Sequence, residues 1–258
     1  MGAFSPAPMG AFSLAGRRAL VTGSTRGIGR AIAEAMIAAG ASVVISSENP
    51  ADTASTAAAL GQAGIACDVA DDAALAALVA GSVAALGGLD IVVANAGITG
   101  RPGPLASLDM DDYARVMAIN LRSQVLLANL AAPHLAHRQG CAIFIASLSA
   151  LRGNGAIGAY ALAKAGVAQL ARNLAVEWGP KGMRANAISP GFIATELSQP
   201  LLDNAAFMAR RMAMTPLRRP GTPAEVAGAA VFLASAAGGF VTGHNLVVDG
   251  GTLITDGS

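Results

Sequence analysis

Short apolar runs alternate with longer helical patterns along almost the whole chain. The apolar runs predict strands over residues 19–22, 42–46, 65–67, 91–94, 142–146, 184–188 and 245–248. The helical patterns predict helices over residues 28–39, 72–85, 109–130, 159–178 and 225–234. Strands that alternate with helices form a parallel sheet through right-handed crossovers, and continuous Val, Ile, Leu and Ala runs are typical of strands covered on both faces. We therefore expect an α/β fold built on a doubly wound parallel sheet flanked by helices.

No linker-like stretch divides the 258 residues, so we expect one domain over residues 14–258. Residues 1–13 repeat the run Met-Gly-Ala-Phe-Ser around two prolines, and we expect them to form a flexible N-terminal extension. They have neither the basic start nor the long apolar core of a signal peptide. Residues 191–220 are the only long stretch without a regular pattern, which is typical of a substrate lid.

The composition and charge argue against several classes of protein. Two long uncharged stretches, at 226–248 and within 72–90, are interrupted by glycine pairs, so we expect no membrane span. The net charge is +1 without a strongly basic run, which gives nucleic-acid binding no electrostatic support. Cys67 and Cys141 lie in apolar runs without metal-ligand or disulfide spacing. We therefore expect two buried thiols, no metal site and a cytoplasmic protein.

A glycine-rich turn, Thr-Gly-Ser-Thr-Arg-Gly-Ile-Gly at residues 22–29, joins the first strand to the first helix. Glycines at such a turn let the backbone approach a pyrophosphate, and the start of the helix offers free N–H donors and a positive dipole end. The turn therefore predicts a dinucleotide site. Its predicted cofactor-binding residues are Gly23, Ser24, Thr25, Arg26, Gly27, Ile28 and Gly29.

The end of the second strand bears on the choice between NADP(H) and NAD(H). Sites selective for NAD usually carry a carboxylate about 20 residues beyond the glycines, to bind the ribose hydroxyls. Ser46 and Ser47 occupy that position here, and both are predicted cofactor contacts. Arg26 can pair with a 2′-phosphate, so the pattern favours NADP(H). Glu48 follows immediately and would favour NAD(H) if its side chain turned inward, so both cofactors stay open.

Two further strand ends carry residues suited to a nucleotide. Asp68 follows the third strand, where a carboxylate can accept a hydrogen bond from an adenine amino group, and Val69 comes next. Asn95, Ala96 and Gly97 follow the fourth strand, where small residues let a ribose or a ring lie against the backbone. We predict cofactor contacts at all five positions.

The candidate catalytic residues are Tyr160, Lys164, Ser147 and Asn120. Tyr160 and Lys164 are four residues apart in a helical stretch, which places both side chains on one face. A neighbouring ammonium lowers the pKa of a phenol, whose unperturbed pKa is about 10, so the pair can exchange a proton with an alcohol or a carbonyl. Ser147 ends the preceding strand and can hydrogen-bond a substrate oxygen. Asn120, on the preceding helix, can hold a water for proton delivery.

Taken together, these motifs resemble the classical short-chain dehydrogenase/reductase family over residues 14–251. The matching segments are residues 22–29, Asn95–Gly97, Asn120, Ser147, Tyr160, Lys164, Ser189–Gly191 with Thr195, and residues 248–251. Ala94 and Ala146 depart from the family, whose members often have Asn and Ser there, but neither change touches the catalytic residues.

The resemblance implies a seven-stranded Rossmann-type sheet, a homotetramer, and hydride transfer between a nicotinamide and a ketone or secondary alcohol. It implies that Tyr160 exchanges the substrate proton and that Lys164 lowers the pKa of Tyr160 and holds the nicotinamide ribose. Ser147 would orient the substrate oxygen, and Asn120 would maintain a water path to Lys164. The segment expected to contact the nicotinamide end supplies Pro190, Gly191, Ile193 and Thr195.

The substrate and several alternative functions stay open. Substrate specificity should be determined by residues 97–105, 148–156 and 192–216. These segments are mostly apolar, which suggests a modest-sized ketone or secondary alcohol. The anion candidates there are Arg152, Arg210 and Arg211. A 3-oxoacyl thioester reductase, an NAD-linked sugar or polyol dehydrogenase, and an isomerase or lyase are alternatives. So is a non-catalytic nucleotide-binding scaffold, although a scaffold would not need the tyrosine–lysine pair.

Overall fold

Seven parallel strands form a single sheet in the order β3-β2-β1-β4-β5-β6-β7 in the computed structural model, which describes residues 10–255. The strands are β1 (Arg18–Thr22), β2 (Ser42–Ser46), β3 (Ala63–Gly64), β4 (Ile91–Ala94), β5 (Cys141–Ile145), β6 (Arg184–Pro190) and β7 (Asn245–Val248). The chain leaves β1 toward β2 and β3 on one side and later returns to β4 on the other. The doubly wound α/β fold and its seven strands are thereby confirmed.

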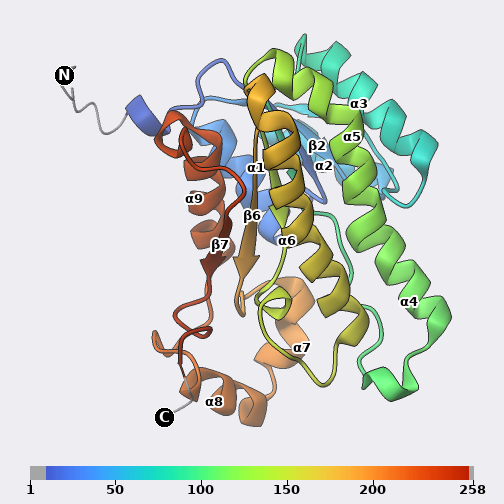
Figure 1. The fold of residues 1–258 in the computed structure, drawn as a ribbon, viewed down its shortest axis with the longest axis vertical. Helices are drawn as coiled ribbons and strands as arrows, with labels where there is room; N and C mark the ends of the chain where they lie inside the picture. Colours follow the sequence, from blue (N-terminus) through green and yellow to red (C-terminus); the bar gives the residue numbers. More distant parts are fainter. Residues whose placement is uncertain (1–9, 256–258) are drawn as a thin grey trace.

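Helices cover both faces of the sheet (Figure 1). They are α1 (Gly27–Ala38), α2 (Pro50–Leu60), α3 (Asp72–Leu86), α4 (Met110–Met117), α5 (Ser123–His137), α6 (Gly158–Trp178), α7 (Gln199–Leu202), α8 (Ala205–Ala213) and α9 (Pro223–Ala234). One hydrophobic core joins α3, α5 and α6 to the sheet, and a second joins α1 and α9 to its other face. Successive strand residues alternate between these cores, as Leu20 and Val21 do in β1, because side chains alternate across a strand.

The helices facing the sheet are rich in alanine. In α1 the buried residues Gly29, Ile32, Ala33 and Met36 recur at helical spacing and form one inner face. The inner face of α6 is likewise made mostly of alanines, which keep the helix close to the strands. Beyond the carboxyl ends of the strands, α7 and α8 form a separate part of the molecule, at the bottom of Figure 1.

Two elements near the third strand differ from the sequence prediction. The strand is Ala63–Gly64 rather than residues 65–67, which run beside β2 with only alternate hydrogen bonds, from Ile65 N to Ile45 O and from Cys67 N to Ser47 O. Helix α2 was missing from the prediction, because its alanine- and threonine-rich sequence lacks an apolar stripe. Its start was nevertheless encoded, since Asn49 caps the helix and Pro50 occupies the first position.

Two other segments are more regular or longer than predicted. The helix expected over residues 109–130 continues to His137 and includes Pro133, with a π-helical turn, Ala118–Arg122, between α4 and α5. Residues 191–220, expected to be irregular, contain α7, α8 and the 3-10 turn Glu196–Ser198, each with a side-chain or proline start signal.

At the N-terminus, residues 1–9 of the expected extension lie outside the described residues. Gly10–Phe12 form a short 3-10 turn, and the Phe12 ring lies 6.4 Å from that of Phe232 in α9. The last part of the predicted extension therefore packs against the domain. Within residues 10–255, no helix is both long enough and apolar enough to cross a membrane.

Candidate active site

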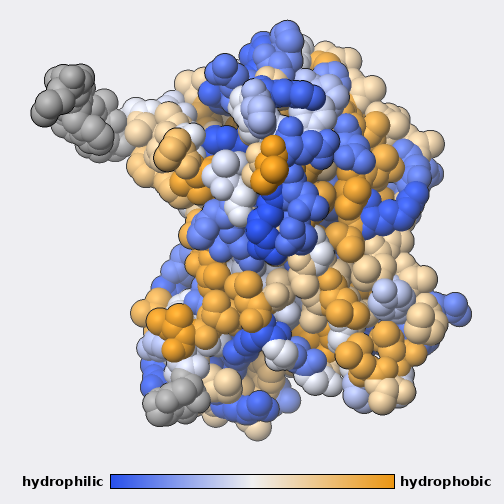
Figure 2. Space-filling view, in the orientation of Figure 1, coloured by the Kyte–Doolittle hydropathy of each residue, from blue (hydrophilic) through white to orange (hydrophobic). Residues whose placement is uncertain are grey.

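A cleft of about 570 Å³ opens at the carboxyl ends of the strands, where ligands bind in doubly wound sheets. The predicted site residues that line it are Gly23, Thr25, Arg26, Gly27, Ile28, Gly29, Ser47, Asp68, Val69, Asn95, Ala96, Gly97, Ser147, Tyr160, Lys164, Pro190, Gly191, Ile193 and Thr195. Figure 2 shows the surface narrowing between the sheet and the part formed by α7 and α8, with apolar side chains gathered along the narrowing. Segments far apart in the sequence thus meet in one place.

The glycine-rich turn is packed so closely that larger residues would not fit. A Cβ atom at Gly29 would lie 2.1 Å from the carbonyl oxygen of Gly23, whose own φ is +63°. The Asn95 amide holds this geometry by donating to the carbonyl oxygens of Thr22 and Gly23, each at 3.0 Å. No side chain caps the start of α1. Its first N–H groups therefore face the cleft, as binding a pyrophosphate requires.

Ser24 and Ser46 do not line the cleft, although both were predicted to contact the cofactor. Ser24 is fully buried, and its hydroxyl donates to the carbonyl oxygen of Val21 at 2.7 Å. The same hydroxyl accepts the main-chain N–H of Ser46 at 2.8 Å. The Ser24 side chain thus ties the turn to the main chain at the end of β2, whereas the Ser46 hydroxyl is buried without a hydrogen-bond partner among the described residues, and neither serine lines the cleft.

The mouth of the cleft near β2 carries a loose pair of opposite charges. Arg26 and Glu48 face each other at 3.7 Å, and both side chains are about two-thirds exposed. Ser47 lies deeper and shares a hydrogen bond with Thr53 at 2.9 Å. One carboxylate oxygen of Asp68 accepts the N–H of Ala70, which leaves the other oxygen free for an adenine amino group. An exposed pair of this kind contributes little stability, so Arg26 can exchange Glu48 for another anion.

The residues predicted to transfer protons converge from β5 and α6. Ser147 lies just beyond β5, and its oxygen accepts the N–H of Ser149 at 3.1 Å, so its hydroxyl can still act as a donor. Tyr160 lies in the first turn of α6, and Lys164 lies one turn later. The Lys164 ammonium is 5.6 Å from the centre of the Tyr160 ring and donates to the carbonyl oxygen of Ile145 at 2.7 Å. All three side chains line the cleft.

Burial dominates the electrostatics of this group. It raises the pKa of Tyr160, and a hydrogen bond with Ser147 acts in the opposite direction. Burial also lowers the pKa of Lys164 from 10.5 to about 8, so the amine still carries its charge at neutral pH. The expectation that Lys164 lowers the pKa of Tyr160 is not met in the structure, where the net shift is upward.

Asn120 is fully buried in the π-helical turn rather than directed to solvent or to the cleft. Its amide oxygen accepts the N–H of Ile98 at 2.8 Å, and its amide nitrogen donates to the Ile98 carbonyl at 2.6 Å. A Cβ atom at Gly97 would lie 3.0 Å from this amide and 3.5 Å from the Lys164 nitrogen. Asn120 therefore fixes the loop after β4 close to Lys164, and a water path through it stays a prediction.

Several cleft residues were absent from the predicted cofactor and catalytic residues. Cys67, Ile119, Ile145 and Ala146 were in no site prediction. Glu48 was the residue that left NAD(H) open, and Ile98, Thr99, Phe192, Glu196, Leu197, Ser198 and Leu201 lie in the segments expected to select the substrate. Most adjoin a predicted residue in the sequence, so the ends of the strands were the signal that could have found them. Burial and the neighbouring Asp68 and Asp71 raise the pKa of Cys67 to about 11, which disfavours a thiolate nucleophile.

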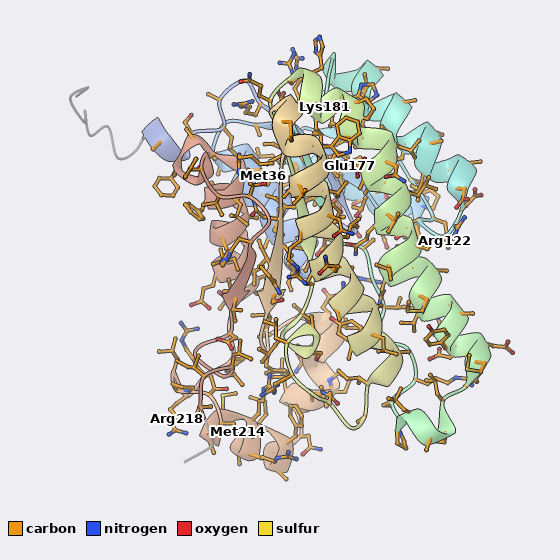
Figure 3. All side chains as sticks on the ribbon, viewed as in Figure 1. Met36, Arg122, Glu177, Lys181, Met214 and Arg218 are labelled. Atoms are coloured by element: carbon orange, nitrogen blue, oxygen red, sulfur yellow. The ribbon has the colours of Figure 1, made fainter. Side chains whose placement is uncertain are left out.

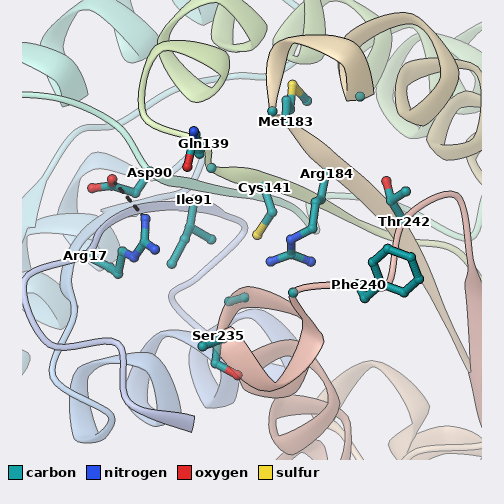
Figure 4. Close-up of a pocket in the computed structure, with 16 residues that line it drawn as sticks. Arg17, Asp90, Ile91, Gln139, Cys141, Met183, Arg184, Ser235, Phe240 and Thr242 are labelled. Carbon is teal, nitrogen blue, oxygen red and sulfur yellow. Dashed lines mark hydrogen bonds and ion pairs between the residues drawn. The ribbon is translucent and has the colours of Figure 1, made fainter. Parts of the chain in front are cut away.

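A second cavity, of about 470 Å³, lies at the opposite end of the strands, where β4, β5 and β6 begin (Figure 4). Arg17 and Asp90 form an ion pair at 3.5 Å on one side, and Arg184 projects beside Cys141 on the other. Arg138 pairs more closely with Asp90, at 2.8 Å. The tyrosine–lysine–serine group lies in the larger cleft, so we place the reaction there.

Comparisons with known proteins agree with this geometry. A family model described as enoyl-(acyl carrier protein) reductase matches residues 23–252. The 2-dehydro-3-deoxy-D-gluconate 5-dehydrogenase of Formosa agariphila is 36% identical over 95% of this chain and 96% of its own. The structure of gluconate 5-dehydrogenase from Burkholderia cenocepacia J2315, in complex with NADP and tartrate, has a TM-score of 0.92 at 38% identity and covers 96% of this chain and 99% of its own.

A 7α-hydroxysteroid dehydrogenase, solved with NADH and 7-oxo glycochenodeoxycholic acid, superposes with a TM-score of 0.88 at 35% identity. The match covers 93% of this chain and 96% of that enzyme. The similarity therefore extends over nearly the whole fold, and it includes relatives solved with either nicotinamide cofactor.

Proposed function

The chain belongs to the classical short-chain dehydrogenase/reductase family and interconverts carbonyls and secondary alcohols with a nicotinamide cofactor, and we propose that Tyr160 exchanges the proton in this reaction. The observation that carries the proposal is the convergence of Ser147, Tyr160 and Lys164 on one cleft. The Ser147 hydroxyl, which hydrogen-bonds Tyr160, orients the substrate oxygen by donating a hydrogen bond to it. Tyr160 then protonates that oxygen during reduction, or accepts its proton during oxidation.

Lys164 and the glycine-rich turn hold the cofactor in this proposal. An ammonium has three donors, and one is used on the Ile145 carbonyl, so two remain for the ribose hydroxyls. The close packing of Gly29 and the uncapped start of α1 suit the pyrophosphate. Gly191 and Thr195 approach from the opposite side of the cleft, Thr195 within 3.7 Å of a Cβ position at Gly27. The nicotinamide, when bound, supplies or accepts the hydride.

NADP(H) is the preferred cofactor in this proposal, and NAD(H) is the alternative. The support is the weakly held Arg26 at the cleft mouth, because a guanidinium binds a phosphate through two parallel hydrogen bonds. Glu48 is the opposing feature, since its charge would repel a 2′-phosphate unless Arg26 neutralises it.

The test compares kcat/KM for NADPH and NADH in three variants. Arg26→Gln should lose about 10- to 100-fold with NADPH and little with NADH, while Glu48→Gln should gain with NADPH. Arg30→Gln is the matched control, because Arg30 is a partly exposed arginine in the first turn of α1, four residues after Arg26, and pairs with Glu34 at 2.8 Å. A wild-type preference for NADH would contradict the assignment.

Substrate class is tested by following cofactor oxidation with ketones, keto-sugars, keto-acids and 3-oxoacyl thioesters. Two of the relatives carry the names of sugar-acid dehydrogenases, which supports a hydroxy acid or its keto form as the first substrates to try. Tight cofactor binding without turnover of any carbonyl would instead favour the non-catalytic scaffold.

A homotetrameric assembly and a cytoplasmic location complete the proposal. Leu162 and Val176 expose 50% and 80% of their surface on the outer side of α6, which supports a helix-to-helix contact between subunits. The two cysteines are buried and free, as suits a reducing compartment. Sedimentation velocity tests the assembly, and a monomer at micromolar concentration would contradict it.

A further inference from the structure

We propose that Arg211, together with Arg152, binds a carboxylate group of the substrate at the wall of the active-site cleft. The inference rests on the proposed function, because it names a chemical feature of the substrate for the same site. It begins from the arginines that have no partner in the fold.

Within residues 10–255, three arginines have neither a side-chain hydrogen bond nor an ion pair. They are Arg152, Arg210 and Arg211, whereas every other arginine contacts a carboxylate, an amide oxygen or a main-chain carbonyl. Arg210 is exposed, so water satisfies its donors. Arg152 and Arg211 are both partly buried, so their lack of partners needs another explanation.

Arg211 is the better defined of the two. It lies in the last turn of α8, and its Nε atom is buried without an acceptor. A buried donor without a partner is destabilising, and more so when the group is charged. The guanidinium lies 5.8 Å from the centre of the Phe192 ring, and Phe192 lines the cleft. Arg211 does not itself line the cleft, but its guanidinium lies behind Phe192, and its terminal nitrogens have no acceptor in the described part of the chain.

Arg152 brings a second positive charge from another element. It lies in the loop that leads from Ser147 to α6, five positions after that serine. Burial, followed by the charge of Arg152, lowers the pKa of Arg211. Like charges held together without an acid between them are the arrangement that an anionic ligand stabilises.

Asp249 is the one acidic group that acts on Arg211, and it does not neutralise the pair. It raises the pKa of Arg211 but forms no ion pair with it at 4 Å or less. Its two carboxylate oxygens instead accept the N–H groups of Gly251 at 2.8 Å and Leu253 at 2.6 Å. A net positive charge therefore remains beside the cleft.

The geometry suits a carboxylate joined to a carbon chain. A planar guanidinium binds a carboxylate through two parallel hydrogen bonds, and a second arginine strengthens the attraction. Phe192 and Leu201 provide an apolar surface on the way to Tyr160. A hydroxy acid, or its keto form, offers both the carboxylate and the carbon that reacts.

The test measures calorimetric binding of D-gluconate and of its uncharged counterpart D-glucitol to the protein saturated with oxidised cofactor. We expect the wild type to prefer the carboxylate. Arg211→Gln should weaken gluconate binding about 10- to 100-fold and leave glucitol binding unchanged, and Arg152→Gln should act in the same direction. Arg210→Gln, the exposed neighbour on the same helix, is the matched control and should change gluconate binding less than about 3-fold. Thermal unfolding of each variant shows whether it is folded.

Equal binding of gluconate and glucitol by the wild type, or equal losses in Arg211→Gln and Arg210→Gln, would overturn the inference. So would an absence of saturable gluconate binding. Gluconate binding that follows the expected pattern without turnover would support the anion site and count against the proposed reaction. Turnover of uncharged alcohols without any effect of a carboxylate would keep the reaction and remove the anion site.

Discussion

Replacing Lys164 with methionine should stabilise the folded chain while it removes turnover. The side chain is 97% buried, and burial lowers the pKa of its amine from 10.5 to about 8. Because each pH unit corresponds to about 1.4 kcal/mol, the buried charge costs about 3 kcal/mol near pH 7. Loss of the hydrogen bond to Ile145 offsets about 1 kcal/mol. The net gain expected for Lys164→Met near pH 7 is therefore about 2 kcal/mol.

The pH dependence distinguishes this cause from a simple packing effect. Between pH 8 and 10.5 the unfolded chain binds more protons at Lys164 than the folded chain, so wild-type stability rises with pH in this window. The cost of the charge should fall to about 1 kcal/mol at pH 9.5, and the advantage of the methionine variant should disappear there. Urea unfolding of both proteins at pH 7 and pH 9.5 measures the difference.

Lys181 provides the matched control, because it follows α6 at the end away from Tyr160 and is exposed (Figure 3). Lys181→Met should shift stability equally at both pH values. The chain has only these two lysines, so the pKa of Lys164 can also be read directly from the side-chain NMR signals of labelled lysine. A destabilised Lys164→Met variant, or an advantage that does not change with pH, would refute the reasoning.

Three further perturbations have defined outcomes. Tyr160→Phe should reduce turnover by at least about 100-fold, while NADPH binding, measured by fluorescence titration, is retained. Normal turnover would refute the assignment of Tyr160 as the residue that exchanges the proton. Gly29→Ala places a Cβ 2.1 Å from a backbone oxygen of the preceding turn and should lower Tm, whereas Gly228→Ala, with open space around it in α9, should leave Tm unchanged or higher. Hydrogen bonding to Arg219 lowers the pKa of Glu225 to about 2, so the stability that wild type holds over Glu225→Gln should be full above about pH 4.5 and shrink as the pH falls toward 2. Acid titrations of the two proteins that run parallel through this range would contradict that last expectation.

The sequence predicted the strands and the cleft because both depend on local patterns. Continuous apolar runs mark buried strands, and the glycine turn together with Tyr160 and Lys164 follows fixed spacing. The prediction missed helix α2 because the helix has no apolar stripe, although the sequence contains its capping residue, Asn49. The helix reads Pro-Ala-Asp-Thr-Ala-Ser-Thr-Ala-Ala-Ala-Leu. Residues 65–67 look like a strand but pair only partly with β2, since pairing depends on a neighbour that the local sequence does not specify.

Sequence spacing could not predict the direction in which the side chains of the site point. Ser24 and Ser47 both sit at strand ends, yet one points behind the turn and the other lines the cleft. Arg211 was one of three anion candidates, and only the packing of α8 distinguishes it from the exposed Arg210. Such differences come from tertiary contacts between elements far apart in the chain.

The π-helical turn between α4 and α5 adds one residue to a long helix and so rotates the part that follows. In an α-helix each residue advances about 100° around the axis, so a single additional residue rotates everything after it by that angle. This offset lets Asn120 face Ile98 while Leu127 and Ala131 of α5 still face the sheet. Deleting one residue here would make an unbroken helix and turn either the amide or the alanine face away from its partner. The rotation of residues about this helix is therefore constrained by Asn120 at one end and by the core-facing residues of α5 at the other.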